Sequence, residues 1–147
     1  MKKINFLISF LLLFSLSNCF SQQLVKTENN AYKIKANQNQ FINKPLSVLI
    51  KEIKPPIRRV TAAPSKDIHS RVGYFIFNFV DSKQKDSLMS KNKIPITIVV
   101  YVKEKFEWDF LKRAKGKETV WTADDLKKYS SLTIVGFRVY GDSSILD

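Results

Sequence analysis

The only histidine of the chain, His69, lies in the segment Asp67-Ile68-His69-Ser70, which places an acid, a base and a hydroxyl close together. A base that is oriented by a carboxylate is a pairing used in general acid–base catalysis. Catalytic triads, however, are usually assembled from distant segments of a chain. The sequence also lacks the Gly-x-Ser-x-Gly turn that exposes the serine nucleophile of many hydrolases. We therefore interpret His69 as a residue of a surface loop, and a small exported hydrolase acting on glycan or peptide is the alternative.

Three acidic residues close in sequence form a second arrangement that could support hydrolysis: Glu104, Glu107 and Asp109. Glycosidases need two neighbouring carboxylates. These residues alternate with lysines, which is typical of a solvated charged surface. A zinc site would need more histidine or cysteine than the chain offers, and no calcium-loop spacing is present. The chain has only four glycines, and they do not form the glycine-rich loop that binds phosphate groups. The sequence therefore predicts no catalytic, cofactor-binding or metal-binding residues, and a non-enzymatic protein.

Lysine and arginine gather in three places along the chain. The third cluster surrounds one tryptophan and lies near the other, and cations beside aromatic rings can bind anionic sugars or phosphates by charge and stacking. The alternative is that both tryptophans belong to the core and the lysines only solvate the surface. The first two clusters are Lys51, Lys54, Arg58 and Arg59, and Lys83, Lys85, Lys91 and Lys93. The candidate partner-binding residues of the third are Lys103, Lys105, Trp108, Lys112, Arg113, Lys115, Lys117 and Trp121.

The first 21 residues have the three-part layout of a signal peptide. Lys2 and Lys3 are followed by an apolar run over residues 6–16, and cleavage after Ser21 leaves small residues at both positions that a signal peptidase inspects. The apolar run is about 16 Å long as a helix, too short for the roughly 30 Å of a bilayer core. We expect a periplasmic or secreted protein without a transmembrane span. A lipoprotein anchored through Cys19 is the alternative.

Charge defines the expected partner. The chain carries 25 Lys and Arg against 13 Asp and Glu, a net charge of +12 that becomes +10 when the signal peptide removes two lysines. This balance favours an acidic protein, an anionic glycan or lipopolysaccharide. Export removes the protein from intracellular DNA and RNA, so we do not expect a nucleic-acid partner. The alternative is a basic surface that serves solubility alone.

The 126 residues that remain after cleavage are enough for one domain. We expect a flexible segment over 22–30 and a single α+β domain over 31–147, with a mainly antiparallel sheet of three to five strands and two or three short amphipathic helices. Alternating apolar residues predict strands over 72–80, 94–103 and 132–140, and a short first strand over 32–36. Their apolar residues occupy most of both faces, which indicates a sheet that is covered on both sides or that packs against a partner.

Helix signals are fewer. Leu46, Leu49, Ile50 and Ile53 form one apolar stripe, with Pro45 as the first helical residue and Asn43 or Lys44 as the cap. A second helix is predicted to begin at Thr122, whose hydroxyl caps it, with Leu126 and Tyr129 facing inward. Residues 106–113 fit either a helix or a strand, and we favour the helix. We expect residues 57–70 to be a loop and residues 81–93 to be a charged connection with at most a helical turn at 86–90.

Overall fold

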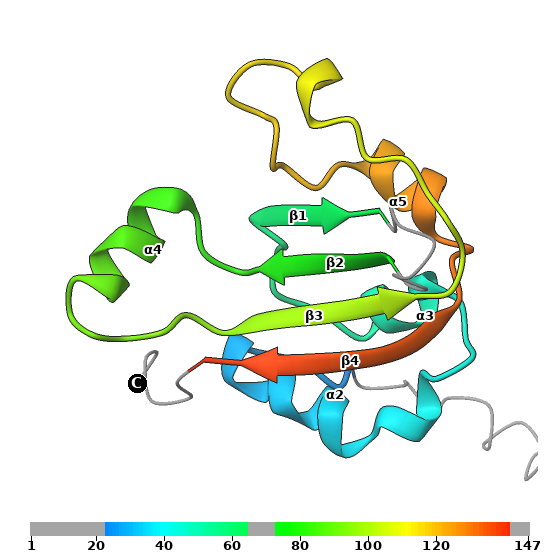
Figure 1. Cartoon of the computed structure of the whole chain (residues 1–147). Coiled ribbons are helices and arrows are strands. Elements are labelled where there is room, and N and C mark those ends of the chain that lie inside the picture. Colours follow the sequence, from blue (N-terminus) through cyan, green and yellow to red (C-terminus); the bar gives the residue numbers. More distant parts are fainter. Residues whose placement is uncertain (1–22, 65–72, 142–147) are drawn as a thin grey trace, which may run out of the picture.

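The computed structural model describes residues 23–64 and 73–141. They contain one four-stranded antiparallel sheet in which each strand pairs with the next along the chain (Figure 1). The strands are β1 (Arg59–Ala63), β2 (Gly73–Asn78), β3 (Thr97–Val102) and β4 (Ile134–Tyr140). This confirms the predicted small α+β domain with an antiparallel sheet.

Four short α-helices accompany the sheet in the described residues: α2 (Tyr32–Ala36), α3 (Leu46–Lys51), α4 (Ser82–Met89) and α5 (Ala123–Tyr129). Single 3-10 turns lie at η1 (Glu28–Ala31), η2 (Gln38–Gln40) and η3 (Phe110–Lys112). In Figure 1, α4 extends beyond the ends of the strands, within the connection from β2 to β3. Over residues 23–64 and 73–141, no helix has the length and apolarity that crossing a membrane needs.

One face of the sheet forms the core. Phe75 and Phe77 of β2 are fully buried and lie beside Val100 and Ile98 of β3. The helices and turns supply the other side of the core with fully buried Ala31, Ile34, Leu46 and Leu49, together with Tyr129. Burial of this apolar area is the main force that holds such short helices in place, because helices of this length are unstable alone.

The opposite face of the sheet is less buried. Side chains alternate between the two faces of a strand, so Tyr74, Ile76 and Tyr101 point away from the core, and each remains partly exposed. Arg138 of β4 lies on the same face, with its guanidinium carbon 5.9 Å from the centre of the Tyr101 ring. The described elements therefore seal one face, and the covering of both faces that the strand patterns indicated is not seen among them.

The strands predicted over 72–80, 94–103 and 132–140 correspond to β2, β3 and β4. The expected burial of Phe75, Phe77 and Phe79 on one face is confirmed. Ile94, however, is 58% exposed, because β3 begins only at Thr97. A fourth strand, β1, lies within residues 57–70, where we expected a loop, and its register opposes Val60 to Phe77.

The helices differ more from the predictions. Residues 32–36, predicted as a strand, form α2, and residues 82–89 form the complete helix α4 rather than a charged connection. The helix favoured over 106–113 is wrong, because only the turn η3 is helical there. Pro45 is the N-cap of α3, with an extended backbone at ψ 146°, and not its first helical residue. Thr122 caps α5 as predicted.

Backbone hydrogen bonds outside the sheet tie its borders to neighbouring segments. The Val60 N–H of β1 donates to the Thr119 carbonyl at 2.6 Å. At the opposite edge of the sheet, formed by β4, the Asn43 N–H donates to the Ile134 carbonyl at 2.8 Å, and the Ile134 N–H donates to the Lys44 carbonyl at 2.9 Å. In the segment for which we expected flexibility, Val25 is fully buried and exchanges backbone hydrogen bonds with Glu52 and Lys54.

Candidate functional site

The candidate partner-binding residues all lie in the connection from β3 to α5, residues 103–122, which we call the 103–122 loop. It runs above β1 in the view of Figure 1. Aromatic side chains of the loop pack against the core. The Phe106 ring stacks on Phe75 with 4.6 Å between centroids, and the Trp121 ring meets Phe77 edge-on at 5.2 Å. Trp108 meets Phe75 edge-on at 6.1 Å. Both tryptophans are partly buried against the core, which agrees with the alternative interpretation of their role.

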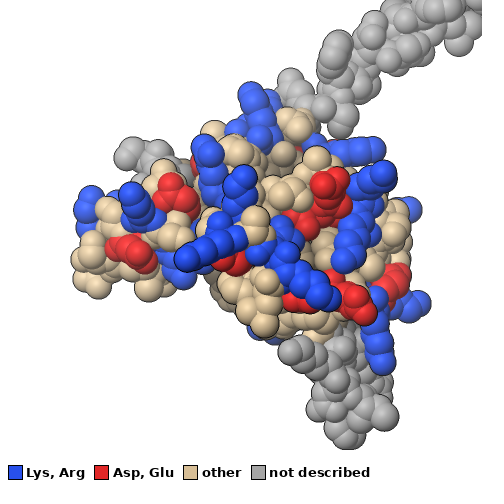
Figure 2. All heavy atoms as spheres, turned by 90° about the horizontal axis from the view of Figure 1, so that it is seen from above, with Lys and Arg blue, Asp and Glu red and all other residues tan. Residues whose placement is uncertain are grey.

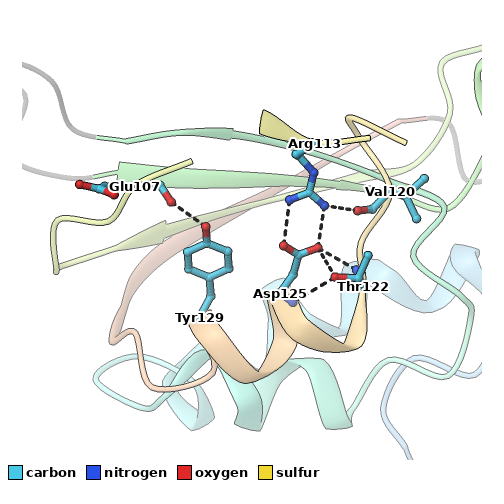
Figure 3. A network of polar contacts seen from close by, with 6 residues as sticks. All are labelled: Glu107, Arg113, Val120, Thr122, Asp125 and Tyr129. Carbon is cyan, nitrogen blue, oxygen red and sulfur yellow. Dashed lines mark hydrogen bonds and ion pairs between the residues drawn. The ribbon is translucent and has the colours of Figure 1, made fainter. Parts of the chain in front are cut away.

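Arg113 also points inward. Its two terminal nitrogens donate to the two carboxylate oxygens of Asp125 at 2.8 and 2.7 Å, and one of them also donates to the Val120 carbonyl at 2.6 Å (Figure 3). The guanidinium carbon lies 4.3 Å from the centre of the Trp108 ring. The side chains of Arg113 and Asp125 are only 17% and 9% exposed. Hydrogen bonding to Asp125 raises the pKa of Arg113. This cation therefore fixes the loop to α5 and is not available to an external anion.

Asp125 is the centre of this network. Its carboxylate accepts hydrogen bonds from the Thr122 N–H at 2.8 Å and the Thr122 hydroxyl at 2.7 Å, while that hydroxyl accepts from the Asp125 N–H. The two residues form a capping box at the start of α5. Burial raises the pKa of Asp125, but hydrogen bonds from Arg113 and Thr122 outweigh burial and hold this pKa below its usual value. One turn further along, the Tyr129 hydroxyl donates to the Glu107 carbonyl at 2.6 Å (Figure 3).

The lysines of the loop point outward. Lys112 pairs with Asp109 at 2.9 Å, and this pair lies in solvent. Hydrogen bonding to Lys112 lowers the pKa of Asp109. The other four lysines are exposed, and their side chains make no ion pair within the part of the chain that the structure describes: Lys103, Lys105, Lys115 and Lys117. Figure 2 looks down on the loop side of the molecule and shows lysine and arginine spread over it with acidic side chains between them.

A hollow of about 390 Å³ opens beside the loop. Its lining includes Phe106 and Trp108, but also Glu107 and Asp109. Lys112 also lines the hollow and pairs with Asp109, so Glu107 leaves the wall with a net negative charge, which disfavours an anion there because like charges repel. An anionic partner would therefore meet the outer lysines and not this hollow.

The structure also shows a feature that the sequence patterns did not indicate. Phe110 and Leu111 of η3 are 48% and 90% exposed. In the helix that we favoured over 106–113, Leu111 would have shared a face with Trp108, three residues earlier. Because η3 is a single turn, its apolar side chains instead project from the loop. A run of two apolar residues between charged neighbours was the only sequence signal for this tip.

Of the carboxylates considered for hydrolysis, Glu107 and Asp109 line the same hollow, whereas Glu104 is not part of its lining. Glu104 accepts hydrogen bonds from the N–H and the hydroxyl of Thr133, both at 2.6 Å. Burial raises the pKa of Glu104, but the Thr133 hydrogen bonds outweigh it and lower this pKa. The described residues contain no group of three or more histidine, cysteine or acidic side chains that could hold a metal ion. Asp67, His69, Ser70 and Cys19 lie outside the described residues.

Comparisons with known proteins return no match: no protein-family model, no curated protein and no solved structure is significantly similar to this chain.

Proposed function

We propose that the protein is an exported, non-enzymatic module that binds an anionic polymer or surface of the cell envelope through the outer side of the 103–122 loop. The observation that supports this most is the division of the loop into two sides. Trp108, Arg113 and Trp121 hold it on the core and on α5. The lysines are left to solvent on the other side.

The form of the lysine surface favours a polyanion over a compact ligand. Lysine ammonium groups are point charges on flexible stems, whereas arginine is the residue that recognises one carboxylate or phosphate in a fixed geometry. The single arginine of the loop is already paired with Asp125. A partner with repeated phosphate or carboxylate groups can contact several lysines at once, and the net charge of +10 that remains after cleavage attracts it from a distance.

The test is the binding of the mature protein to soluble heparin, measured by calorimetry at rising salt. We expect binding that weakens strongly, because the Debye length falls from about 10 Å at 0.1 M to about 3 Å at 1 M ionic strength. K115Q/K117Q should bind more weakly than K83Q/K85Q. The second variant loses the same charge from the exposed surface of α4. Equal losses in both variants would assign the binding to net charge alone, and salt-independent binding would contradict an electrostatic partner.

Export is tested separately by the mass of the N-terminus after expression in a bacterial host. Our proposal expects a mature chain that begins at Gln22 and is found in the periplasm or the medium. A diacylglyceryl mass on Cys19 would instead establish the lipoprotein. An unprocessed chain that stays in the cytoplasm would contradict export in either form.

A further inference from the structure

The tip of the 103–122 loop exposes two adjacent apolar side chains. Leu111 is 90% exposed and Phe110 is 48% exposed, and Val120 of the same loop is 37% exposed. Single apolar residues on a surface are common and need no explanation. Two adjacent ones on a projecting turn are different, because hydration of this apolar area is unfavourable and nothing in the described residues relieves it.

Hydrogen bonds and an ion pair hold the backbone of this tip in place. The Asp109 carboxylate accepts hydrogen bonds from the Leu111 N–H at 3.1 Å and the Lys112 N–H at 3.2 Å, which fixes the turn at its start. Directly after the turn, Arg113 ties the loop to Asp125 of α5. An apolar tip that is ordered in the free protein loses little conformational entropy when it is buried by a partner.

The loop that carries the tip contains six lysine and arginine residues. Lys112 is part of the turn, and the other exposed lysines of the loop are Lys103, Lys105, Lys115 and Lys117. The loop also carries four carboxylates. Three of them already accept hydrogen bonds from the protein: Glu104 from Thr133, Asp109 from the turn and Glu118 from the Gly116 N–H.

We infer that the loop docks on an anionic lipid bilayer, with Phe110 and Leu111 entering the boundary between headgroups and acyl chains and the lysines contacting lipid phosphates. This inference rests on the proposed function, because it names a lipid surface as the polyanion. Apolar side chains at the tip of a loop and basic side chains in the same loop are the combination with which proteins bind a membrane surface. Lysine stems can run along the inserted side chains and leave their ammonium groups at the phosphates.

A bilayer fits this tip better than an acidic protein does. A stable protein interface buries about 800 Å² on each partner around a well-packed apolar centre. Two apolar side chains on a single turn are too few for such a centre. They are sufficient for a shallow insertion, because transfer of one large apolar side chain out of water strengthens binding by about tenfold or more.

The experiment is co-sedimentation of the mature protein with vesicles of phosphatidylcholine alone, or of equal parts phosphatidylcholine and phosphatidylglycerol. The same variants are measured on soluble heparin. We expect binding to the anionic vesicles only. F110S/L111S should lose at least about tenfold of its vesicle affinity and keep its heparin affinity. K115Q/K117Q should weaken on both, by about fivefold for each lysine that approaches the lipid surface.

The matched control is I94S. Ile94 is 58% exposed and follows Lys91 and Lys93 in the connection from α4 to β3. This connection enters one end of β3, whereas the 103–122 loop leaves the other end (Figure 1). It should bind vesicles like the unaltered protein. An unchanged tryptophan emission spectrum without vesicles shows that each variant is folded, because Trp108 and Trp121 pack on the core.

The outcomes separate the two proposals. Vesicle binding by F110S/L111S that equals that of the unaltered protein would overturn the insertion of the tip. An equal loss for I94S would overturn its assignment to the loop. Binding to heparin but not to anionic vesicles would overturn the lipid surface and leave the proposed function standing. A loss of heparin affinity in F110S/L111S would assign the tip to a general anion- or protein-binding surface. Binding to neither probe would refute the proposed function itself.

Discussion

The replacement of Asp125 by asparagine tests whether the ion pair with Arg113 holds the 103–122 loop in place. Asparagine keeps the shape of the side chain and an oxygen that can accept from Thr122, but it removes the charge that Arg113 faces. Removal of one partner from a buried ion pair costs about 3–5 kcal/mol, because it leaves an uncompensated charge. Here Arg113 keeps the Val120 carbonyl and the Trp108 ring, so we expect a smaller loss, about 2–3 kcal/mol of unfolding free energy.

The assay is urea unfolding followed by tryptophan fluorescence, which reports on the loop through Trp108 and Trp121. For a domain of this size, the expected loss corresponds to a fall in Tm of about 6–15 °C. A double-mutant cycle with Arg113→Met isolates the pair. Residues in direct contact should couple by about 1 kcal/mol or more, whereas independent sites add within about 0.5 kcal/mol. Additive effects, or a loss below about 0.5 kcal/mol for Asp125→Asn, would refute the role of the ion pair.

The same pair predicts a pH dependence. The pKa of Asp125 is lower in the folded protein than its usual value, because hydrogen bonds from Arg113 and Thr122 outweigh the effect of burial. A carboxylate whose pKa is lower in the folded state stabilises the protein. This stabilisation is fully present above the unfolded-state pKa of about 3.9 and is lost as the pH falls through the folded-state pKa. The difference in stability between the unaltered protein and Asp125→Asn should therefore be constant at neutral pH and shrink in acid. A difference that grows in acid would contradict this sign.

Three further predictions concern the scaffold, each measured by urea unfolding. Phe75→Ala should remove about 3–5 kcal/mol, because Phe75 is fully buried beneath the loop, and a loss below about 1 kcal/mol would mean that the loop does not pack there. Tyr129→Phe should remove about 1 kcal/mol with the hydrogen bond to the loop carbonyl, and an unchanged stability would argue against that bond. Gly141→Ala should be more harmful than Gly116→Ala. Both glycines have positive φ, with an expected penalty of about 1–2 kcal/mol, but only at Gly141 would the new Cβ meet backbone, 2.6 Å from the Ile96 Cα. Equal losses would show that this contact relaxes freely.

Elements with a regular pattern and a local end signal could be predicted from the sequence. The alternation of Phe75, Phe77 and Phe79 places one face of β2 in the core, and Thr122 marks the start of α5. Both signals act over a few residues, so distant parts of the chain do not change them.

The missed elements depend on contacts between distant segments or on short patterns. Residues 32–36 alternate like a strand, but five residues do not distinguish a period of 2 from one of 3.6, and the single buried Ile34 belongs to a helical turn. β1 buries only Val60 and exists because β2 pairs with it. α4 buries no residue, and its local signal was the capping box of Asp81 and Gln84.

The candidate site was predictable in position but not in its division into two sides. The sequence places cations and tryptophans together over residues 103–121. It does not show that Arg113 turns toward Asp125, twelve residues away, while Lys112 points outward. Neighbouring residues of the same charge thus have opposite roles, since the choice depends on where α5 packs.

The hydrogen bonds at the borders of the sheet leave fewer backbone groups open for another chain to pair with. Open sheet edges present unpaired N–H and C=O groups, which can add a strand from another chain and start aggregation. Here the 103–122 loop occupies the outer side of β1 through Thr119, and the segment with Asn43 and Lys44 occupies the outer side of β4. The backbone of the sheet is thereby blocked at these positions against strand addition. The loop that we propose as the binding surface thus also occupies part of the sheet edge at β1.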